Sequence, residues 1–135
     1  GGPMEDIAQA FAELEPAMPW TQTRHYRAAL GDEYMANYAY ANLLGWEGLI
    51  ENEQCLVCFF IIGPERKYPS HNHEAEEIYF PFGGDTLWQQ GSSPPFLREP
   101  ASGVHNTPWL PHSITTQKTP MFSLALWSSP SKMQI

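Results

Sequence analysis

The sequence has little positive charge and no long apolar run. Only seven Lys and Arg residues accompany fifteen Asp and Glu residues, for a net charge of -8. Without a basic cluster, nucleic acid and anionic membrane surfaces are not expected partners. No apolar stretch approaches the length of a membrane-spanning helix, about 18 residues, and no export signal is visible. We therefore expect a soluble, cytoplasmic protein.

Cysteine is also scarce. The two cysteines, Cys55 and Cys58, form a C-x-x-C pair of the kind found in redox and zinc sites. They belong to the apolar run 55–62, where an offset of three places side chains on opposite faces of a strand. No second pair is present to complete a zinc site. Both are predicted to be packing residues in a reducing compartment.

The first 44 residues are expected to form an extension to the main fold. Residues 1–3 (Gly-Gly-Pro before Met) resemble a cloning remnant. Ile7, Phe11 and Leu14 recur at helical spacing, which predicts a short amphipathic helix capped by Asp6 and ended by Pro16. The apolar face of residues 7–14 is a candidate surface for a homodimer. After it, a second helix from Gly31 and a strand from about Ala36 are both compatible with residues 31–44, and the strand is favoured.

The remaining chain has the pattern of an all-β domain. At 135 residues the protein is one domain, and about two thirds of the unfolded surface can be buried. Residues 45–130 are expected to form a barrel, with residues 131–135 as a tail. Pro81 should restrict its strand to an edge or bulge, and Gly83-Gly84-Asp85 is predicted to be a hairpin turn. Short strands at regular intervals indicate a sandwich or barrel. The expected strands cover 36–44, 54–62, 78–80, 86–88, 96–98, 104–106, 113–116 and 122–127.

A cluster of metal-binding residue types lies near the middle of the chain. On an extended strand His71 and His73 point to the same face. Glu77 and Tyr79 also share a face if the strand re-forms after a bend at residues 74–76. Neutral imidazole and carboxylate are ligands for divalent transition metals. The spacing H-x-H-x3-E resembles the first motif of the cupin barrels, and His112 is the best candidate for the histidine of the second motif. The sequence therefore predicts a cupin, a double-stranded β-helix or jelly-roll barrel, with a short N-terminal helical segment.

From about residue 45 to 127 the chain resembles a narrower group, the cupin-type dimethylsulfoniopropionate lyases. The likeness rests on Ile62-Gly63-Pro64, on residues 68–79 (YPSHNHEAEEIY), on Gly103-Val104-His105-Asn106 and on Pro111-His112-Ser113. A tyrosine five residues before the second histidine, together with one two residues after the glutamate, is much more restrictive than the cupin motif alone. Trp109 departs from the general cupin pattern, which has glycine there.

The resemblance implies a site and a reaction. His71, His73, Glu77 and His112 would bind one divalent metal ion, Fe²⁺, Mn²⁺, Zn²⁺ or Ni²⁺. Tyr79 would be the base of a β-elimination that converts dimethylsulfoniopropionate to dimethyl sulfide and acrylate. Tyr68 would orient the substrate or act as the base in place of Tyr79. A sulfonium binds well to aromatic π faces. The expected substrate contacts are Trp109, Trp88, Trp127, Tyr68 and His105.

Two other functions are compatible with the residues. Three histidines and a glutamate also serve cupin dioxygenases and sugar isomerases. A phosphosugar isomerase would need a cationic phosphate clamp, and only Arg66, Lys67, Arg98 and Lys118 lie near the barrel segments. A non-catalytic cupin that binds a small ligand has no need of phenols at both 68 and 79. Catalysis is therefore favoured over simple binding.

Overall fold

The structure is a computed structural model that describes residues 2–129. The tail predicted for residues 131–135 lies outside the described residues. Two α-helices and a 3₁₀ turn precede the strands. The helical elements are α1 (Pro3–Leu14), η1 (Glu15–Ala17) and α2 (Tyr26–Met35). The strands are β1 (Tyr38–Leu44), β2 (Leu56–Ile62), β3 (Lys67–His71), β4 (Glu77–Pro81), β5 (Thr86–Gln90), β6 (Phe96–Arg98), β7 (Val104–Asn106), β8 (His112–Thr116) and β9 (Met121–Trp127).

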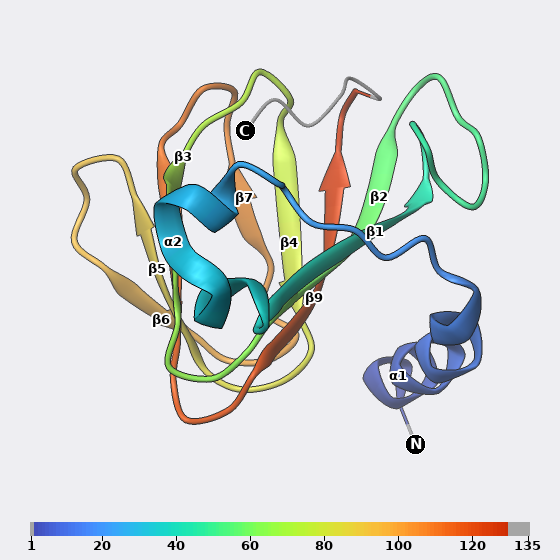
Figure 1. Cartoon of the computed structure of the whole chain (residues 1–135), viewed down its shortest axis with the longest axis horizontal. Helices are drawn as coiled ribbons and strands as arrows, with labels where there is room; N and C mark the ends of the chain where they lie inside the picture. The colour runs from blue at the N-terminus through green and yellow to red at the C-terminus, as the bar shows by residue number, and fades with distance from the viewer. Residues whose placement is uncertain (1, 130–135) are drawn as a thin grey trace.

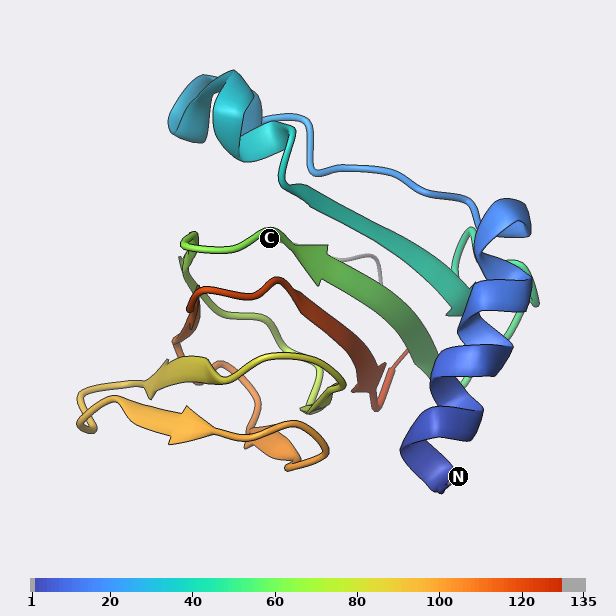
Figure 2. The ribbon, with the colours of Figure 1, turned by 90° about the horizontal axis from the view of Figure 1, so that it is seen from below.

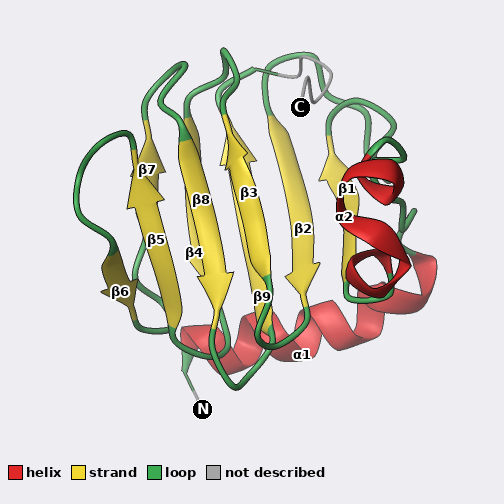
Figure 3. Cartoon of the chain, turned by 60° about the vertical axis from the view of Figure 1, so that its left-hand side comes forward, coloured by secondary structure: helices red, strands yellow, loops and turns green. Residues whose placement is uncertain are grey.

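The strands form two antiparallel sheets, which confirms the all-β prediction. One sheet has the order β1-β2-β9-β4-β7 and the other the order β3-β8-β5-β6. Figure 3 shows the strands gathered into one body, with the two helices outside it. Side chains that alternate toward the interior from both sheets make the main core. Its largest fully buried members include Trp88, Tyr68, Leu56, Ile62 and Ile114.

The β4–β5 connection differs from the predicted hairpin. Strand β4 belongs to the five-stranded sheet and β5 to the four-stranded sheet, so the turn carries the chain from one sheet to the other. Gly84 takes the left-handed conformation there, with φ of 69°. A Cβ at this position would stand 2.2 Å from the Thr119 hydroxyl oxygen, so glycine is needed for both reasons.

Pro81 does not make β4 an edge strand, because β4 lies between β9 and β7. Strand β7 pairs only with Glu77–Tyr79, however, and has ended before Pro81 is reached. The Pro81 carbonyl points to that side, where it accepts a hydrogen bond from the Ala101 amide at 2.8 Å. The missing N–H of proline therefore faces a position without a neighbouring strand, which is why proline is tolerated here.

Helix α1 packs on the outside of the five-stranded sheet (Figure 2). Phe11 lies against Phe59 of β2 and Phe122 of β9, with ring centroids 4.8 and 4.0 Å apart. The helix begins at Pro3 and not at the predicted Asp6 cap; Asp6 lies in its first turn. Phe11 and Leu14, from the face considered for a homodimer, pack against a smaller apolar cluster of Met18, Ala41 and Phe59. This face is therefore partly covered within the chain.

Helix α2 begins five residues before the predicted Gly31 and packs elsewhere. Gly31 sits at a kink inside it, with φ of 85°. The strand favoured from about Ala36 is confirmed as β1, which starts at Tyr38. Helix α2 buries Tyr26, Tyr34 and Met35 against the barrel. Neither helix in the described part of the chain is long and apolar enough to cross a membrane.

Candidate metal centre

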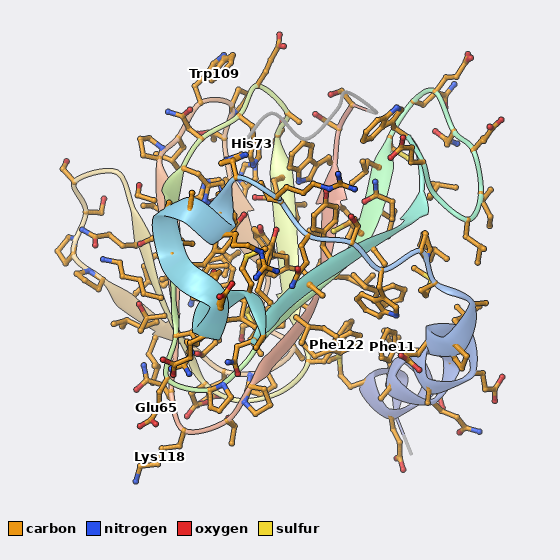
Figure 4. The ribbon with its side chains drawn as sticks, in the orientation of Figure 1. Phe11, Glu65, His73, Trp109, Lys118 and Phe122 are labelled. Carbon is orange, nitrogen blue, oxygen red and sulfur yellow. The ribbon has the colours of Figure 1, made fainter. Side chains whose placement is uncertain are left out.

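Three histidines from neighbouring strands meet at one end of the barrel. His71 ends β3 and stands opposite His112, the first residue of β8, in the antiparallel register. His73 follows two residues after His71. One ring nitrogen from each histidine lies within 4.8 Å of the others, close enough to bind a common ion. Figure 4 shows His73 at the same end of the barrel as Trp109 and opposite Glu65 and Lys118.

Each imidazole is oriented by a backbone carbonyl close to it in the chain. Because a carbonyl oxygen can only accept, the Nδ1 atom of each ring must carry the hydrogen. The Nε2 atom is then left with a lone pair, the form in which histidine binds a metal. The hydrogen bonds run from His71 to Pro69 (2.9 Å), from His73 to Ala75 (2.9 Å) and from His112 to Leu110 (2.8 Å).

The fourth group is Glu77, the first residue of β4, whose side chain is 1% exposed. Its Oε1 atom lies 3.4 Å from Nε2 of His73 and 3.2 Å from Nε2 of His112. Both nitrogens are buried and lack a hydrogen-bond partner in the part of the chain that the structure describes. Lone pairs that face a carboxylate repel it unless a cation lies between them, and such buried atoms are costly when unpaired. The four groups therefore fit a metal cation.

The charge states of two of these groups also suit metal binding. Burial, with the nearby His112, lowers the pKa of His71 to about 4, so this ring is neutral at pH 7. Burial alone would raise the pKa of Glu77, but hydrogen bonds from the His112 and His73 rings, which require a proton on Nε2, lower it to about 2 in the metal-free site. A metal ion would take the place of these protons. A neutral imidazole and an ionised carboxylate are the donors that divalent transition metals accept.

Two residues that the sequence interpretation missed support the carboxylate. Asn106, which is fully buried in β7, donates to Oε1 of Glu77 at 3.1 Å. Gln90 of β5 in turn donates to the Asn106 side-chain oxygen at 2.8 Å, linking the two sheets. Such partners fix the orientation of a metal ligand. Strand alternation in residues 104–106 could have revealed Asn106, since it must face the opposite side from His105.

The two predicted catalytic tyrosines both lie in the interior near the histidines. Tyr79 is 4% exposed, and its ring lies 6.4 Å from the His112 ring. Tyr68 is 1% exposed and meets the His71 ring edge-on at 4.6 Å. Burial raises the pKa of both phenols well above 10. Neighbouring tyrosines add to this effect at Tyr68, and the Glu77 carboxylate adds to it at Tyr79. Each phenol is therefore protonated unless a nearby cation compensates.

The three predicted substrate-contacting tryptophans occupy different environments. Trp127 stacks on His73 with centroids 4.1 Å apart, and its indole N–H donates to Oε2 of Glu77. Trp88 is fully buried beside Tyr79, at 5.0 Å, with its N–H bound to a threonine hydroxyl. Trp109 is 57% exposed.

The backbone explains how Trp109 replaces the glycine of the general cupin pattern. Its φ is 62°, the left-handed conformation that glycine adopts without cost. The Trp109 amide donates to the His73 carbonyl at 2.8 Å, so this strained position is tied to the histidine loop. The indole is thereby held at the end of the barrel where the histidines lie (Figure 4).

The structure does not bring His105 to the cluster. In β7 the side chains of Val104 and Asn106 are buried, whereas that of His105 is exposed on the outer face. Its Nε2 atom lies 2.6 Å from the Glu76 carboxylate, which is also exposed. Strand alternation thus separates His105 from the interior site.

Comparison with protein families matches residues 1–123 to the dimethylsulfoniopropionate lyase family. Dimethylsulfoniopropionate lyase DddQ from Ruegeria pomeroyi is 28% identical over 121 residues, which cover 90% of this chain and 60% of that protein. Putative dimethylsulfoniopropionate lyase DddL from Cereibacter sphaeroides is also 28% identical, over 85% of this chain and 47% of its own length. The chain thus spans about half to three fifths of these curated relatives.

Solved structures share the fold of this chain. The crystal structure of DddQ from Ruegeria pomeroyi matches all of this chain and 67% of its own with a TM-score of 0.86 at 26% identity. An RmlC-like cupin with a double-stranded β-helix fold from Methanocaldococcus jannaschii matches 60% of this chain and 75% of its own with a TM-score of 0.55 at 8% identity. The predicted cupin fold is therefore confirmed.

Proposed function

The chain belongs to the dimethylsulfoniopropionate lyase family, and on this premise we propose that it is a metal-dependent lyase for that substrate. The products would be dimethyl sulfide and acrylate. The observation that carries the proposal is that this chain, a member of the family, holds a three-histidine cluster flanked by two buried phenols. A binding protein would have no use for both phenols.

We assign the metal ligands to His71, His73, His112 and Glu77. The unpartnered Nε2 atoms of His73 and His112 and the ionised carboxylate of Glu77 support this assignment. A divalent ion held there would supply a Lewis acid toward the substrate carboxylate. The donor set suits iron, manganese, zinc or nickel.

The base in this proposal is Tyr79. Its phenolate would take a proton from the carbon next to the substrate carboxylate. The released electron pair forms the carbon–carbon double bond as the carbon–sulfur bond breaks, and neutral dimethyl sulfide leaves. Burial and the Glu77 charge raise the pKa of Tyr79, so the base needs a compensating positive charge at the histidine cluster. Activity should therefore depend strictly on metal.

The aromatic groups have separate roles in substrate binding. We assign orientation of the substrate to Tyr68, whose ring touches His71. The exposed indole of Trp109 offers a π face to the sulfonium. Trp127 and Trp88 support the site from within, through His73 and Tyr79 respectively.

Headspace gas chromatography for dimethyl sulfide tests the proposal. Protein stripped of metal and reloaded separately with iron(II), manganese, zinc and nickel should release the gas only after reloading, and His73→Ala should release none. Tyr79→Phe should lower the rate at least about 100-fold, the usual contribution of a general base. If the Tyr79→Phe variant still released dimethyl sulfide at the wild-type rate, the base would be assigned to Tyr68. No release with any metal would contradict the lyase assignment, and oxygen uptake by the iron(II) form would then test a dioxygenase.

A further inference from the structure

A hydrogen bond links helix α2 to the interior of the barrel. The hydroxyl oxygens of Tyr26, the first residue of α2, and Tyr68, in β3, lie 3.1 Å apart in a buried environment. The two residues are 42 positions apart in the chain. Tyr26 is 7% exposed and Tyr68 is 1% exposed, so water does not readily replace either partner.

Several ring contacts define the position of the Tyr68 ring. Phe60 meets it edge-on at 5.0 Å, Tyr38 lies at 5.9 Å and His71 at 4.6 Å. These contacts hold the ring, but among the described residues only Tyr26 is recorded as a hydrogen-bond partner of its hydroxyl. The direction of the Tyr68 O–H bond therefore depends on Tyr26.

Helix α2 is anchored well enough to serve this purpose. The Tyr26 ring contacts Tyr38 of the five-stranded sheet at 5.7 Å and Tyr68 of the four-stranded sheet at 5.8 Å, so it bridges the two sheets. A second link joins Glu33 of α2 to Arg66, next to the start of β3, at 2.6 Å. In Figure 1, α2 lies across the front of the barrel, away from α1.

From this geometry we infer that Tyr26 is a positioning residue of the site, which orients the Tyr68 hydroxyl toward the substrate beside His71. The inference rests on the proposed lyase function for its catalytic consequence. It makes the N-terminal segment part of the active site, although that segment lies outside the metal-binding motifs. No contact of Tyr26 with His71, His73 or His112 is recorded among the described residues.

Tyr34 provides a matched control. It lies on the same helix and is also 7% exposed, but its buried hydroxyl has no hydrogen-bond partner among residues 2–129. Tyr26→Phe and Tyr34→Phe each remove one buried hydroxyl from α2. Only the first removes the bond to Tyr68.

Steady-state release of dimethyl sulfide is the first measurement. In the metal-loaded protein, Tyr26→Phe should lower kcat/KM about five- to tenfold, the range expected when one hydrogen bond that orients a reacting group is lost. Tyr34→Phe should stay within twofold of wild type. In a Tyr68→Phe background, adding Tyr26→Phe should change nothing further, because the two residues act as a unit. Equal losses in Tyr26→Phe and Tyr34→Phe would overturn the inference. Additive losses when Tyr26→Phe is combined with Tyr68→Phe would overturn it as well.

The second measurement does not depend on activity. Ring-labelled tyrosine resonances can be assigned with the Tyr→Phe variants, since the chain has six tyrosines. Tyr26→Phe should shift the Tyr68 hydroxyl-bearing carbon, and Tyr34→Phe should leave it in place. If the wild type released no dimethyl sulfide but this shift appeared, the proposed function would fail while the positioning contact stood. An unmoved Tyr68 resonance would overturn the contact itself.

Discussion

The two faces of the five-stranded sheet use the same strands for different purposes. Along β4, Glu77 and Tyr79 point into the barrel, while Ile78 points outward. Polar groups on the inner face converge on the histidines. The outer face carries apolar side chains that α1 covers in part, as Phe11 does in Figure 4. Adjacent residues of one strand thus serve the site and the outer packing respectively, because side chains alternate between the two faces of the sheet. Substitutions at adjacent positions should separate them too.

The largest contrast should come from neighbouring glutamates. Glu77→Gln removes the buried carboxylate charge that faces His73 and His112, and we expect dimethyl sulfide release to fall at least about 100-fold, in line with the loss of charge stabilisation at a buried site. Glu76→Gln makes the same chemical change on the exposed side and should leave the rate within about twofold, since exposed ion pairs contribute little. Comparable losses in both variants would mean that the two faces are not functionally distinct. Metal content measured on the purified variants should fall only in Glu77→Gln.

The inner face should also make the metal-free protein sensitive to acid. The pKa of His71 is about 4 in the folded chain, against 6.5 for a free histidine, because of burial and the nearby His112. Between pH 6.5 and 4 the unfolded chain therefore binds a proton that the folded chain resists. The free energy of unfolding should fall by about 3 kcal/mol over this range. Glu77, with a pKa of about 2 against 4.5, adds a further loss only below pH 4.5.

Urea unfolding of chelator-treated protein at pH 7 and pH 4.5 measures this effect. His71→Gln removes the titrating ring and should flatten the pH dependence above pH 4.5. An equally steep dependence in the variant would assign the acid sensitivity to other groups.

The sequence interpretation was strongest where a motif combines residue type with spacing. The H-x-H-x3-E pattern pointed to His71, His73 and Glu77, which the fold brings together, because the end of β3, the loop after it and the start of β4 are close in sequence. Asn106 and Gln90 were missed because their contact joins two sheets, and no local pattern records which strands will become neighbours. Helix α2 was misplaced for a related reason. Its buried tyrosines pack against β1 and β3, and it lacks the apolar periodicity that made α1 predictable.

Helix α1 offers a test of the outer face. Phe11→Ala removes the ring that packs on Phe59 and Phe122 and should lower the free energy of unfolding by about 2 kcal/mol, less than for a fully buried phenylalanine because Phe11 is partly exposed. At a temperature where the variant remains folded, its rate of dimethyl sulfide release should match wild type. Thermal unfolding and activity measured on the same sample distinguish the two effects. A specific loss of activity without destabilisation would extend the site to the outer face.

The smallest expected effect separates the two neighbours in β7. Asn106→Ala leaves Oε1 of Glu77 without its amide donor and should weaken metal binding about tenfold, as is typical when a partner of a metal ligand is removed. His105→Ala changes the outward side chain and should not alter metal affinity, which also tests the sequence-based prediction that His105 contacts the substrate. Asn42→Ala, which removes another buried amide from the same sheet, controls for general destabilisation. Metal affinity is measured by competition with a chromophoric chelator. If Asn42→Ala weakened binding as much as Asn106→Ala, the loss would reflect the stability of the whole sheet and not the orientation of Glu77.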